Sequence, residues 1–111
     1  MADDKDVLHE IDLGRLDTSL AARVGNVIRA ELRIAILVHL LRNPRMSPRQ
    51  VARALHVTEG NTGYHFGKLV EAGAIDKVDS DKVRGATRGI YMVTDFGQHA
   101  LRVAVAVKSL A

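Results

Sequence analysis

The sequence contains no cysteine and two prolines, and aromatic side chains make up only 4% of its 111 residues. Without cysteine, the chain forms no disulfide, no thiolate metal site and no cysteine nucleophile. Its longest apolar run, residues 34–41, is interrupted by His39 and is far shorter than the roughly 20 residues that cross a bilayer. The sequence therefore predicts neither redox chemistry through the protein nor a membrane helix.

The N-terminal segment lacks the pattern of an export signal. Residues 1–17 carry six acidic and two basic side chains, whereas a secretory signal begins with basic residues followed by apolar ones. We therefore expect a cytoplasmic protein. Residues 1–17 are interpreted as an acidic N-terminal arm, and residues 18–111, in a chain that is 47% apolar, as one domain with a single modest core.

The sequence also lacks the motifs of catalysis. Its histidines are dispersed through the chain without the usual metal-ligand spacing, as His9, His39, His56, His65 and His99. No local nucleophile–base–acid arrangement and no phosphate-binding glycine loop is present. We therefore expect no enzyme activity, no metal and no cofactor.

Positive charge is concentrated outside the N-terminal arm. Residues 18–111 carry fourteen basic and seven acidic side chains, although the net charge of the whole chain is only +3. Such a basic body indicates a polyanionic partner, and a basic soluble protein without one is the alternative.

Apolar periodicity predicts two helices between Thr18 and Arg42, with a bend near residues 29–31. Asn43 and Pro44 end the second helix, because proline removes a backbone donor and disfavours helical geometry in the preceding residue. The apolar face of this pair consists of Leu20, Val24, Val27, Ile28, Leu32, Ile36, Leu37, Leu40 and Leu41.

The next segment predicts two short helices joined by a tight turn. Ser47 and Gln50 form a capping box around Pro48, which suits the first helical position. Thr58 caps the following helix, which runs to about residue 72 and ends at Gly73. Two capped helices separated by about three residues are typical of a helix-turn-helix unit, whose second helix enters the major groove of DNA.

Residues 75–93 change to β-branched and aromatic side chains. We expect short strands at residues 75–78 and 88–93 around the polar segment DSDKVRGAT, which together form a β-hairpin with a long basic tip. Thr94 and Asp95 then start a helix that continues through Leu110. The expected fold is mainly α with a small β-hairpin (α+β), and helices at both termini form a dimer interface.

The outward face of the helix at residues 58–72 carries the candidate DNA contacts. Placing Thr62, Phe66 and Leu69 inward leaves an opposite face with polar groups, which comprises Thr58, Gly60, Asn61, Tyr64, His65 and Lys68. Asparagine forms paired hydrogen bonds with adenine, while tyrosine and lysine reach phosphates or base edges.

Basic residues on two other segments are candidates for the DNA backbone. Arg49 and Arg53 lie one helical turn apart on the first helix of the motif, and a solvated basic face is the alternative for them. On the hairpin, Lys82, Arg84 and Arg88 form a basic wing, residues 79–88, that straddles the backbone or enters the minor groove.

Three glycines are unusual within the second helix of the motif. Gly60, Gly63 and Gly67 each cost about 0.8 to 1 kcal/mol relative to alanine. One interpretation is that they allow the helix backbone to approach DNA closely. Tolerated local weakness, or a helix that orders only on binding, is the alternative.

The last helix is apolar over more of its circumference than one neighbouring surface covers. A partner chain would cover the rest, through Leu20, Val24, Ala100, Val103, Ala104 and Val107. Such a two-fold interface sets two reading helices about 34 Å apart on a palindromic site. A helix packed only on its own domain is the alternative.

Residues 24–102 resemble the small winged helix-turn-helix regulators of the MarR and ArsR type. The segments that carry the resemblance are VGNVIRAELRIAILVHLL, VTEGNTGYHFGKLVEAGAI and IYMVTDFGQHAL. The resemblance implies a homodimeric transcriptional regulator that binds double-stranded DNA sequence-specifically, with residues 58–72 in the major groove and the wing on the backbone or minor groove. A winged-helix protein interaction module without DNA binding is the alternative.

The chain departs from that family pattern at three positions. His56 stands where such turns often have glycine, Thr62 where an aliphatic residue is usual, and Gly63 where serine is common. The absence of cysteine also argues against the thiolate metal sensing of many ArsR-type proteins. No effector is identified by the sequence.

Overall fold

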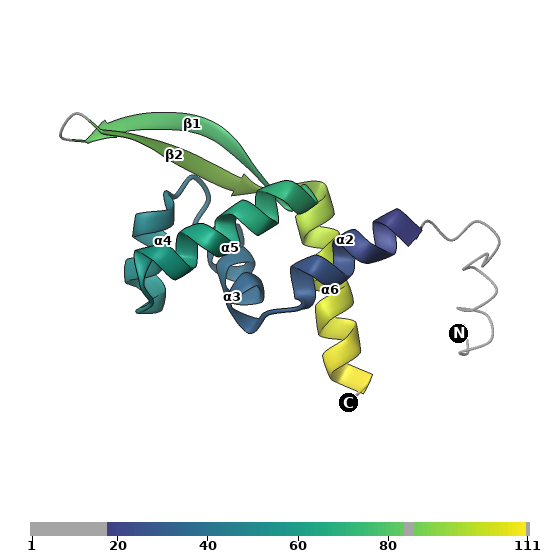
Figure 1. Ribbon diagram of the computed structural model, residues 1–111. Helices are drawn as coiled ribbons and strands as arrows, with labels where there is room; N and C mark the ends of the chain where they lie inside the picture. Colours follow the sequence, from purple (N-terminus) through teal and green to yellow (C-terminus); the bar gives the residue numbers. More distant parts are fainter. Residues whose placement is uncertain (1–17, 84–85, 111) are drawn as a thin grey trace.

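The computed structural model describes residues 18–83 and 86–110 (Figure 1). Its elements in chain order are α2 (Thr18–Ile28), α3 (Glu31–Arg42), α4 (Pro48–Leu55), α5 (Glu59–Ala72), β1 (Ile75–Val83), β2 (Ala86–Val93) and α6 (Asp95–Leu110). Within the described residues, five helices accompany one two-stranded antiparallel sheet. The predicted fold class is confirmed, while the acidic arm and Arg84 lie outside the described residues.

The predicted bend between the first two described helices is a complete break. Residue Ala30 is extended and stands as the N-cap of α3 without a side-chain hydrogen bond. The axis of α2 therefore does not continue that of α3, and α2 packs against α5 and α6. In Figure 1, α2 and α6 lie together at the end of the molecule away from the hairpin tip.

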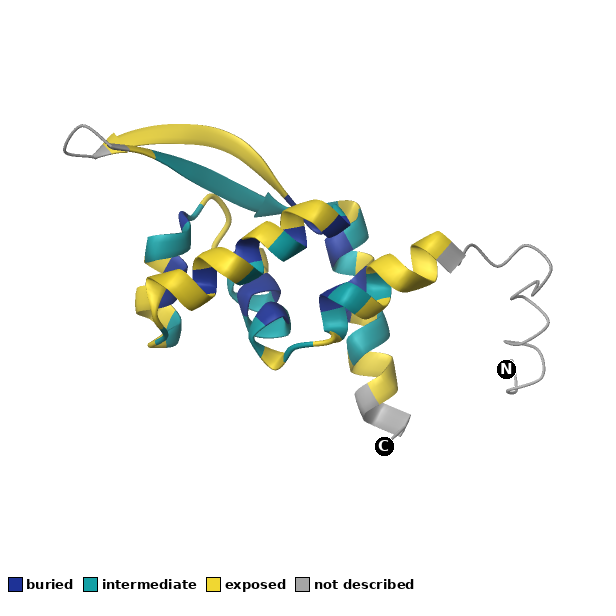
Figure 2. Ribbon diagram, viewed as in Figure 1, coloured by how far each residue is buried: buried dark blue, intermediate teal, exposed yellow. Residues whose placement is uncertain are grey.

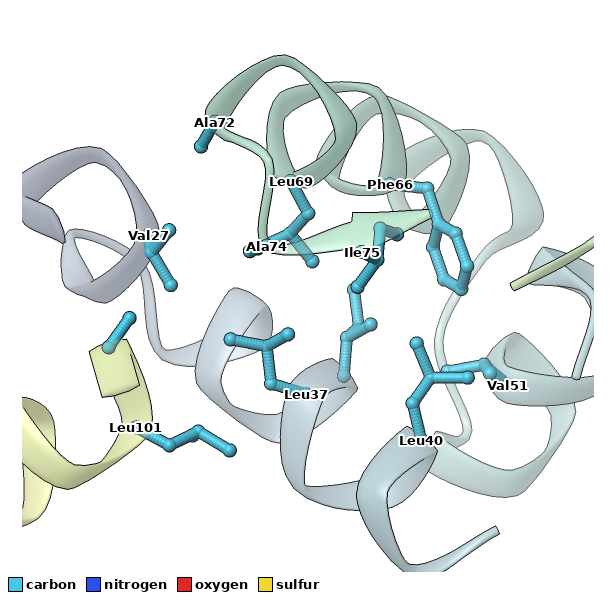
Figure 3. Close-up of a cluster of buried hydrophobic side chains, with 12 residues drawn as sticks. Val27, Leu37, Leu40, Val51, Phe66, Leu69, Ala72, Ala74, Ile75 and Leu101 are labelled. Carbon is cyan, nitrogen blue, oxygen red and sulfur yellow. The ribbon is translucent and has the colours of Figure 1, made fainter. Parts of the chain in front are cut away.

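The core lies between α3, α5 and the start of β1, with α6 at one side (Figure 3). Its largest fully buried apolar side chains are Ile36, Leu37, Leu40, Leu69, Ile75, Val27 and Val51. The expected inner position of Leu41 is wrong, because its side chain is 48% exposed. Leu41 lies one residue beyond Leu40, at the edge of the buried stripe, where it borders a groove shared with α6.

The capping signals place the two helices of the motif as predicted. The Ser47 side chain accepts a hydrogen bond from the Gln50 backbone N–H at 3.3 Å, and the Gln50 side chain accepts one from the Ser47 N–H at 2.9 Å. Thr58 Oγ1 accepts from the Asn61 N–H at 3.2 Å, and Gly73 ends α5 in the left-handed conformation. Between the helices His56 also adopts left-handed angles, φ 56° and ψ 43°, a conformation that histidine tolerates better than most residues.

The strands of the hairpin are longer than the sequence predicted. They continue through the polar segment, with Lys82 opposite Thr87 and Asp81 opposite Arg88, so the expected long loop is wrong. The sequence did not reveal the length of the strands, because alternation of apolar and polar residues marks a strand only where one face is buried. Most of β1 is exposed, so it lacks that pattern (Figure 2). A backbone hydrogen bond of 2.9 Å from the Tyr91 N–H to the Met46 carbonyl ties the ribbon to the segment before α4.

The junction between the hairpin and α6 is closely packed. Thr94 Oγ1 donates to the Gly73 carbonyl at 2.6 Å and accepts from the Gly97 N–H at 3.0 Å, so Thr94 caps α6 as expected and fixes it to the end of α5. At Gly97 an added Cβ would fall well inside van der Waals contact of the Ala74 carbonyl oxygen.

We predict that Gly97→Ala lowers the free energy of unfolding by about 3 kcal/mol, because the methyl group must displace backbone rather than a flexible side chain. Gly25→Ala is the matched control, since Gly25 is also helical and an added Cβ there meets no atom within 4 Å. That variant should gain up to about 1 kcal/mol from helix propensity. Urea unfolding measures both, and equal stabilities of the two variants would contradict the packing described for Gly97.

Candidate nucleic-acid interface

The recognition helix α5 presents a polar face on the side opposite the core. Its inner residues Thr62, Phe66, Leu69 and Ala72 are buried, as the helical spacing predicted for the first three. The Thr62 hydroxyl donates to the Thr58 carbonyl at 2.8 Å, so this polar group is satisfied inside the core. Figure 2 shows the exposed residues along the outer side of α5.

Most of the predicted contact residues of α5 lie on that outer side. Thr58, Gly60, Asn61 and Tyr64 are exposed, with Tyr64 58% exposed, whereas His65 and Lys68 are half-buried. The Lys68 ammonium lies 5.7 Å from the centre of the Tyr64 ring, which places a cation and an aromatic hydroxyl on one part of the surface. This surface, formed by these six residues, is called the α5 face below.

Two acidic residues form ion pairs with basic residues on or near the α5 face. The Glu71 carboxylate lies 3.5 Å from Lys68 Nζ, and the Glu59 carboxylate lies 3.1 Å from Arg49 Nε. In each pair the carboxylate side chain is mostly exposed, at 63% for Glu59 and 67% for Glu71, so water screens the pair and it contributes little to stability. Arg49, which the sequence assigned to phosphate binding, is therefore paired within the chain in this structure.

The hairpin and α4 meet around a hollow of about 260 Å³ that is lined by Ser47, Pro48, Arg49, Glu59, Arg88 and Gly89. It brings together basic residues that the sequence placed on separate elements, Arg49 on α4 and Arg88 on β2. Arg53 is exposed on α4, and Lys82 is exposed towards the end of β1. Of the predicted wing residues, Arg84 lies outside the described part of the chain.

A third ion pair holds the middle of β1. Arg45 Nη2 lies 2.6 Å from Asp79 Oδ2, and the other oxygen of Asp79 accepts from the Ser80 backbone N–H at 2.8 Å. Asp79 is thus used to fix the ribbon to the segment before α4. This arrangement accounts for an acidic residue in a segment that is otherwise rich in cations.

The three glycines of α5 lie in open space. An added Cβ at Gly60, Gly63 or Gly67 meets no atom within 4 Å, so packing inside the chain does not require glycine at any of them. Their spacing of three and four residues places them along one stripe of the helix. The stripe faces away from Thr62 and Leu69, towards the same side as Tyr64.

His65 is held from behind by Arg33, a residue that sequence reasoning missed. Arg33 Nε donates to His65 Nδ1 at 3.0 Å, and Arg33 is only 5% exposed. Burial, and then the nearby guanidinium, lower the pKa of His65 from its ordinary value of 6.5. The signal in the sequence was an arginine on the apolar stripe of α3, at the helical spacing of Ile36, Leu37 and Leu40.

The predicted interface residues of the terminal helices differ in exposure. Leu20 is 38% and Val107 55% exposed, while Val24, Val103 and Ala104 are half-buried. Ala100 is fully buried, so its side chain already belongs to the core of its own chain. Among the described residues, no cluster of three histidines or carboxylates could hold a metal, and no helix is long and apolar enough to cross a membrane.

The described elements define a winged helix-turn-helix fold, in which α4 and α5 form the motif and the β1–β2 ribbon is the wing (Figure 1). A family model described as "Winged helix-turn-helix DNA-binding" matches residues 29–76, which contain α3, α4 and α5. A comparison with curated protein sequences finds no matching relative.

Solved structures of transcriptional regulators have the same fold. The chain is similar to a crystal structure of MarR, at 21% identity and a TM-score of 0.65 over 96% of this chain and 77% of that one. It is also similar to a homodimeric winged helix-turn-helix DNA-binding domain from Mycobacterium bovis, which is described as a possible ArsR-family regulator. The two are 19% identical, with a TM-score of 0.57 over 99% of this chain and 86% of that one. A transcriptional regulator homologue from Pyrococcus horikoshii is 23% identical, with a TM-score of 0.61 over 85% of this chain and 94% of that one. The resemblance expected from the sequence is confirmed for the fold.

The lowered pKa of His65 predicts a pH dependence of stability. The unfolded chain has the higher pKa and takes up the proton first as pH falls below about 6.5, so the folded state loses stability on acidification. We expect the free energy of unfolding to fall more for wild type than for His65→Asn between pH 7.5 and pH 5.5. Urea unfolding at the two pH values measures this difference, and an equal fall in both proteins would contradict it.

Proposed function

We propose that this protein is a homodimeric transcriptional regulator that binds double-stranded DNA sequence-specifically. The observation that carries the proposal is the α5 face, which is exposed and polar on the helix that a helix-turn-helix unit inserts into the major groove. The family model over residues 29–76 and the regulators of like fold support it. The proposal includes a cytoplasmic location and no enzyme activity.

The roles of the residues follow from their places around α5. Asn61 and Tyr64 read base edges in the major groove, and the Thr58 hydroxyl and the free N–H groups at the start of α5 bind a phosphate. Arg53, Lys82 and Arg88 bind the backbone or minor groove, and the sequence assigns the same role to Arg84, which lies outside the described residues. When a phosphate approaches the hollow between α4 and the wing, Arg49 leaves its ion pair with Glu59 and binds the phosphate.

Two chains are needed to read a palindromic site, and the terminal helices supply the surface. A groove of about 570 Å³ between α3 and α6 is lined by Val38, Leu41, Arg42, Gln98, Leu101, Arg102, Val105 and Ala106. Val105 is 65% and Val107 55% exposed, so the second half of α6 presents apolar side chains to solvent. We assign this surface, together with Leu20, Val24, Val103 and Ala104, to contact with a second copy, and we treat residues 18–111 as one domain preceded by the arm.

Salt dependence of DNA binding tests the proposal. We expect log affinity to fall linearly with log salt, with a slope of about −0.9 for each phosphate neutralised, and sedimentation of the complex to give two chains per duplex. Arg88→Ala should reduce the slope by about 2, because each of the two chains loses one phosphate contact, and weaken preferred and random duplexes alike. Asn61→Ala should leave the slope unchanged and cost about 1 to 3 kcal/mol for each half-site, on the preferred duplex only.

An interaction module without DNA binding would show no such slope on any duplex. The preferred duplex is obtained by selecting bound fragments from a random pool, which also gives the spacing of its half-sites. Equal losses on preferred and random duplexes for Asn61→Ala would remove Asn61 from the base-reading residues.

The glycine stripe makes a separate prediction, because stability and affinity should change in opposite directions. In the double variant Gly60→Ala and Gly63→Ala, the free energy of unfolding should rise by about 1 kcal/mol per substitution. The added methyl groups meet open space, and alanine favours the helix. Its DNA affinity should fall, because the same methyl groups keep the α5 backbone away from the groove. Gly25→Ala on α2 should gain stability without losing affinity, and unchanged or tighter binding by the double variant would refute close approach.

A further inference from the structure

A buried positive charge lies directly behind the α5 face. Arg33 is in the first turn of α3 and is 5% exposed, although arginine is almost never fully buried unless it is paired. Among the described residues, no carboxylate forms an ion pair with Arg33. Its guanidinium is instead held by neutral acceptors on two other helices.

These acceptors fix the guanidinium in one orientation. Arg33 Nη1 donates to the backbone carbonyl of Asn26, near the end of α2. It also donates to the side-chain oxygen of Asn26 at 2.8 Å. Nε donates to Nδ1 of His65 on α5 at 3.0 Å. Asn26 therefore orients Arg33, and Arg33 donates one hydrogen bond to a ring nitrogen on the recognition helix.

The contact determines where His65 carries its proton. A guanidinium has only donors, so Nδ1 must be the acceptor and a neutral imidazole must then carry its hydrogen on Nε2. Among the described residues, no group forms a hydrogen bond with Nε2. His65 is half-buried, and its ring packs edge-on against the exposed Tyr64 ring at 5.2 Å between centroids.

We propose that Arg33 positions His65 as a fixed hydrogen-bond donor to duplex DNA, with Nδ1 held by Arg33 and Nε2–H directed to an acceptor atom of the bound duplex. The inference rests on the proposed DNA binding and adds to it one contact residue and the buried residue that positions it. The acceptor is guanine O6 or N7, adenine N7, thymine O4 or a phosphate oxygen. The amino groups of cytosine and adenine are donors, so the fixed tautomer cannot pair with them.

The tautomer of His65 is the first test, and it needs no DNA. We expect long-range ¹H–¹⁵N correlation spectra of the free protein at pH 7.5 to show His65 protonated on Nε2 and unprotonated on Nδ1. Arg33→Gln should release this preference and give a mixture of tautomers. A main form protonated on Nδ1 in wild type would overturn the proposal.

The second test separates the two nitrogen atoms of the ring. In His65→Asn the side-chain oxygen can still accept from Arg33, but the donor at the position of Nε2 is lost. We expect its DNA affinity to fall about tenfold for each half-site, which is the loss of one hydrogen bond to a strong acceptor per chain. His99→Asn, at an exposed histidine on α6, is the matched control and should bind as wild type does.

The pattern of losses identifies the acceptor. A loss confined to the preferred duplex assigns a base edge, and an equal loss on random duplexes assigns a phosphate. If wild type binds duplex DNA with the expected salt slope and His65→Asn binds equally tightly, the donor role is wrong and the proposed function stands. If wild type shows no salt-dependent binding, the proposed function fails, and the tautomer spectrum still decides whether Arg33 sets the proton position.

A double-mutant comparison distinguishes positioning from a general structural role of Arg33. Arg33→Gln should weaken DNA binding when His65 is present and cause no further loss in the His65→Asn background. An equal loss in both backgrounds would show that Arg33 acts on the fold rather than through His65. Should Arg33→Gln not fold, the wild-type tautomer and the affinity of His65→Asn remain decisive.

Discussion

The packing of one side of α5 against α3 and the start of β1 determines the rest of the molecule. Phe66 and Leu69 lie in the same buried cluster as Ile36, Leu40 and Ile75 (Figure 3). Because these side chains fix the rotation of α5 about its axis, they also fix which residues point to solvent. The buried apolar side chains thus determine which way the polar surface of α5 points, although none of them is part of that surface.

Three polar side chains close to this core form hydrogen bonds within the chain, and these bonds help to keep α5 in one position. Thr62 donates to the backbone of its own helix, Arg33 donates to His65 and Asn26, and Ser47 is held in its capping box. An unsatisfied polar group at any of these places would cost free energy comparable to a lost hydrogen bond. The surface proposed for DNA therefore stands on a rigid scaffold, which lowers the entropy lost on binding.

Sequence reasoning succeeded where the chemistry is local. The caps at Ser47 and Thr58, the end of α5 at Gly73 and the inward direction of Phe66 depend on residues a few positions apart, and the structure confirms them. It failed where the partner is distant in sequence. Arg33 and His65 are separated by 32 residues, and nothing in either segment alone indicates that they meet.

The hairpin shows a different limit. Alternation of apolar and polar residues predicts a strand only when one face is buried, and β1 beyond Ile75 is exposed. The candidate contact residues of the α5 face could be listed from the helical period. The pairing of Arg49 with Glu59 could be seen only once the turn between α4 and α5 was placed in space.

One side chain of α2 joins the end of α5 to the start of α6. The Arg23 guanidinium stacks 4.1 Å above the centre of the Phe96 ring on α6, and its Nε donates to the Ala72 carbonyl at the end of α5 at 2.9 Å. A tilt of α2 would therefore pull on the last turn of α5 and on the first turn of α6 together. In a two-chain assembly joined through its terminal helices, the distance between the two α5 helices would follow the angle at which the subunits meet.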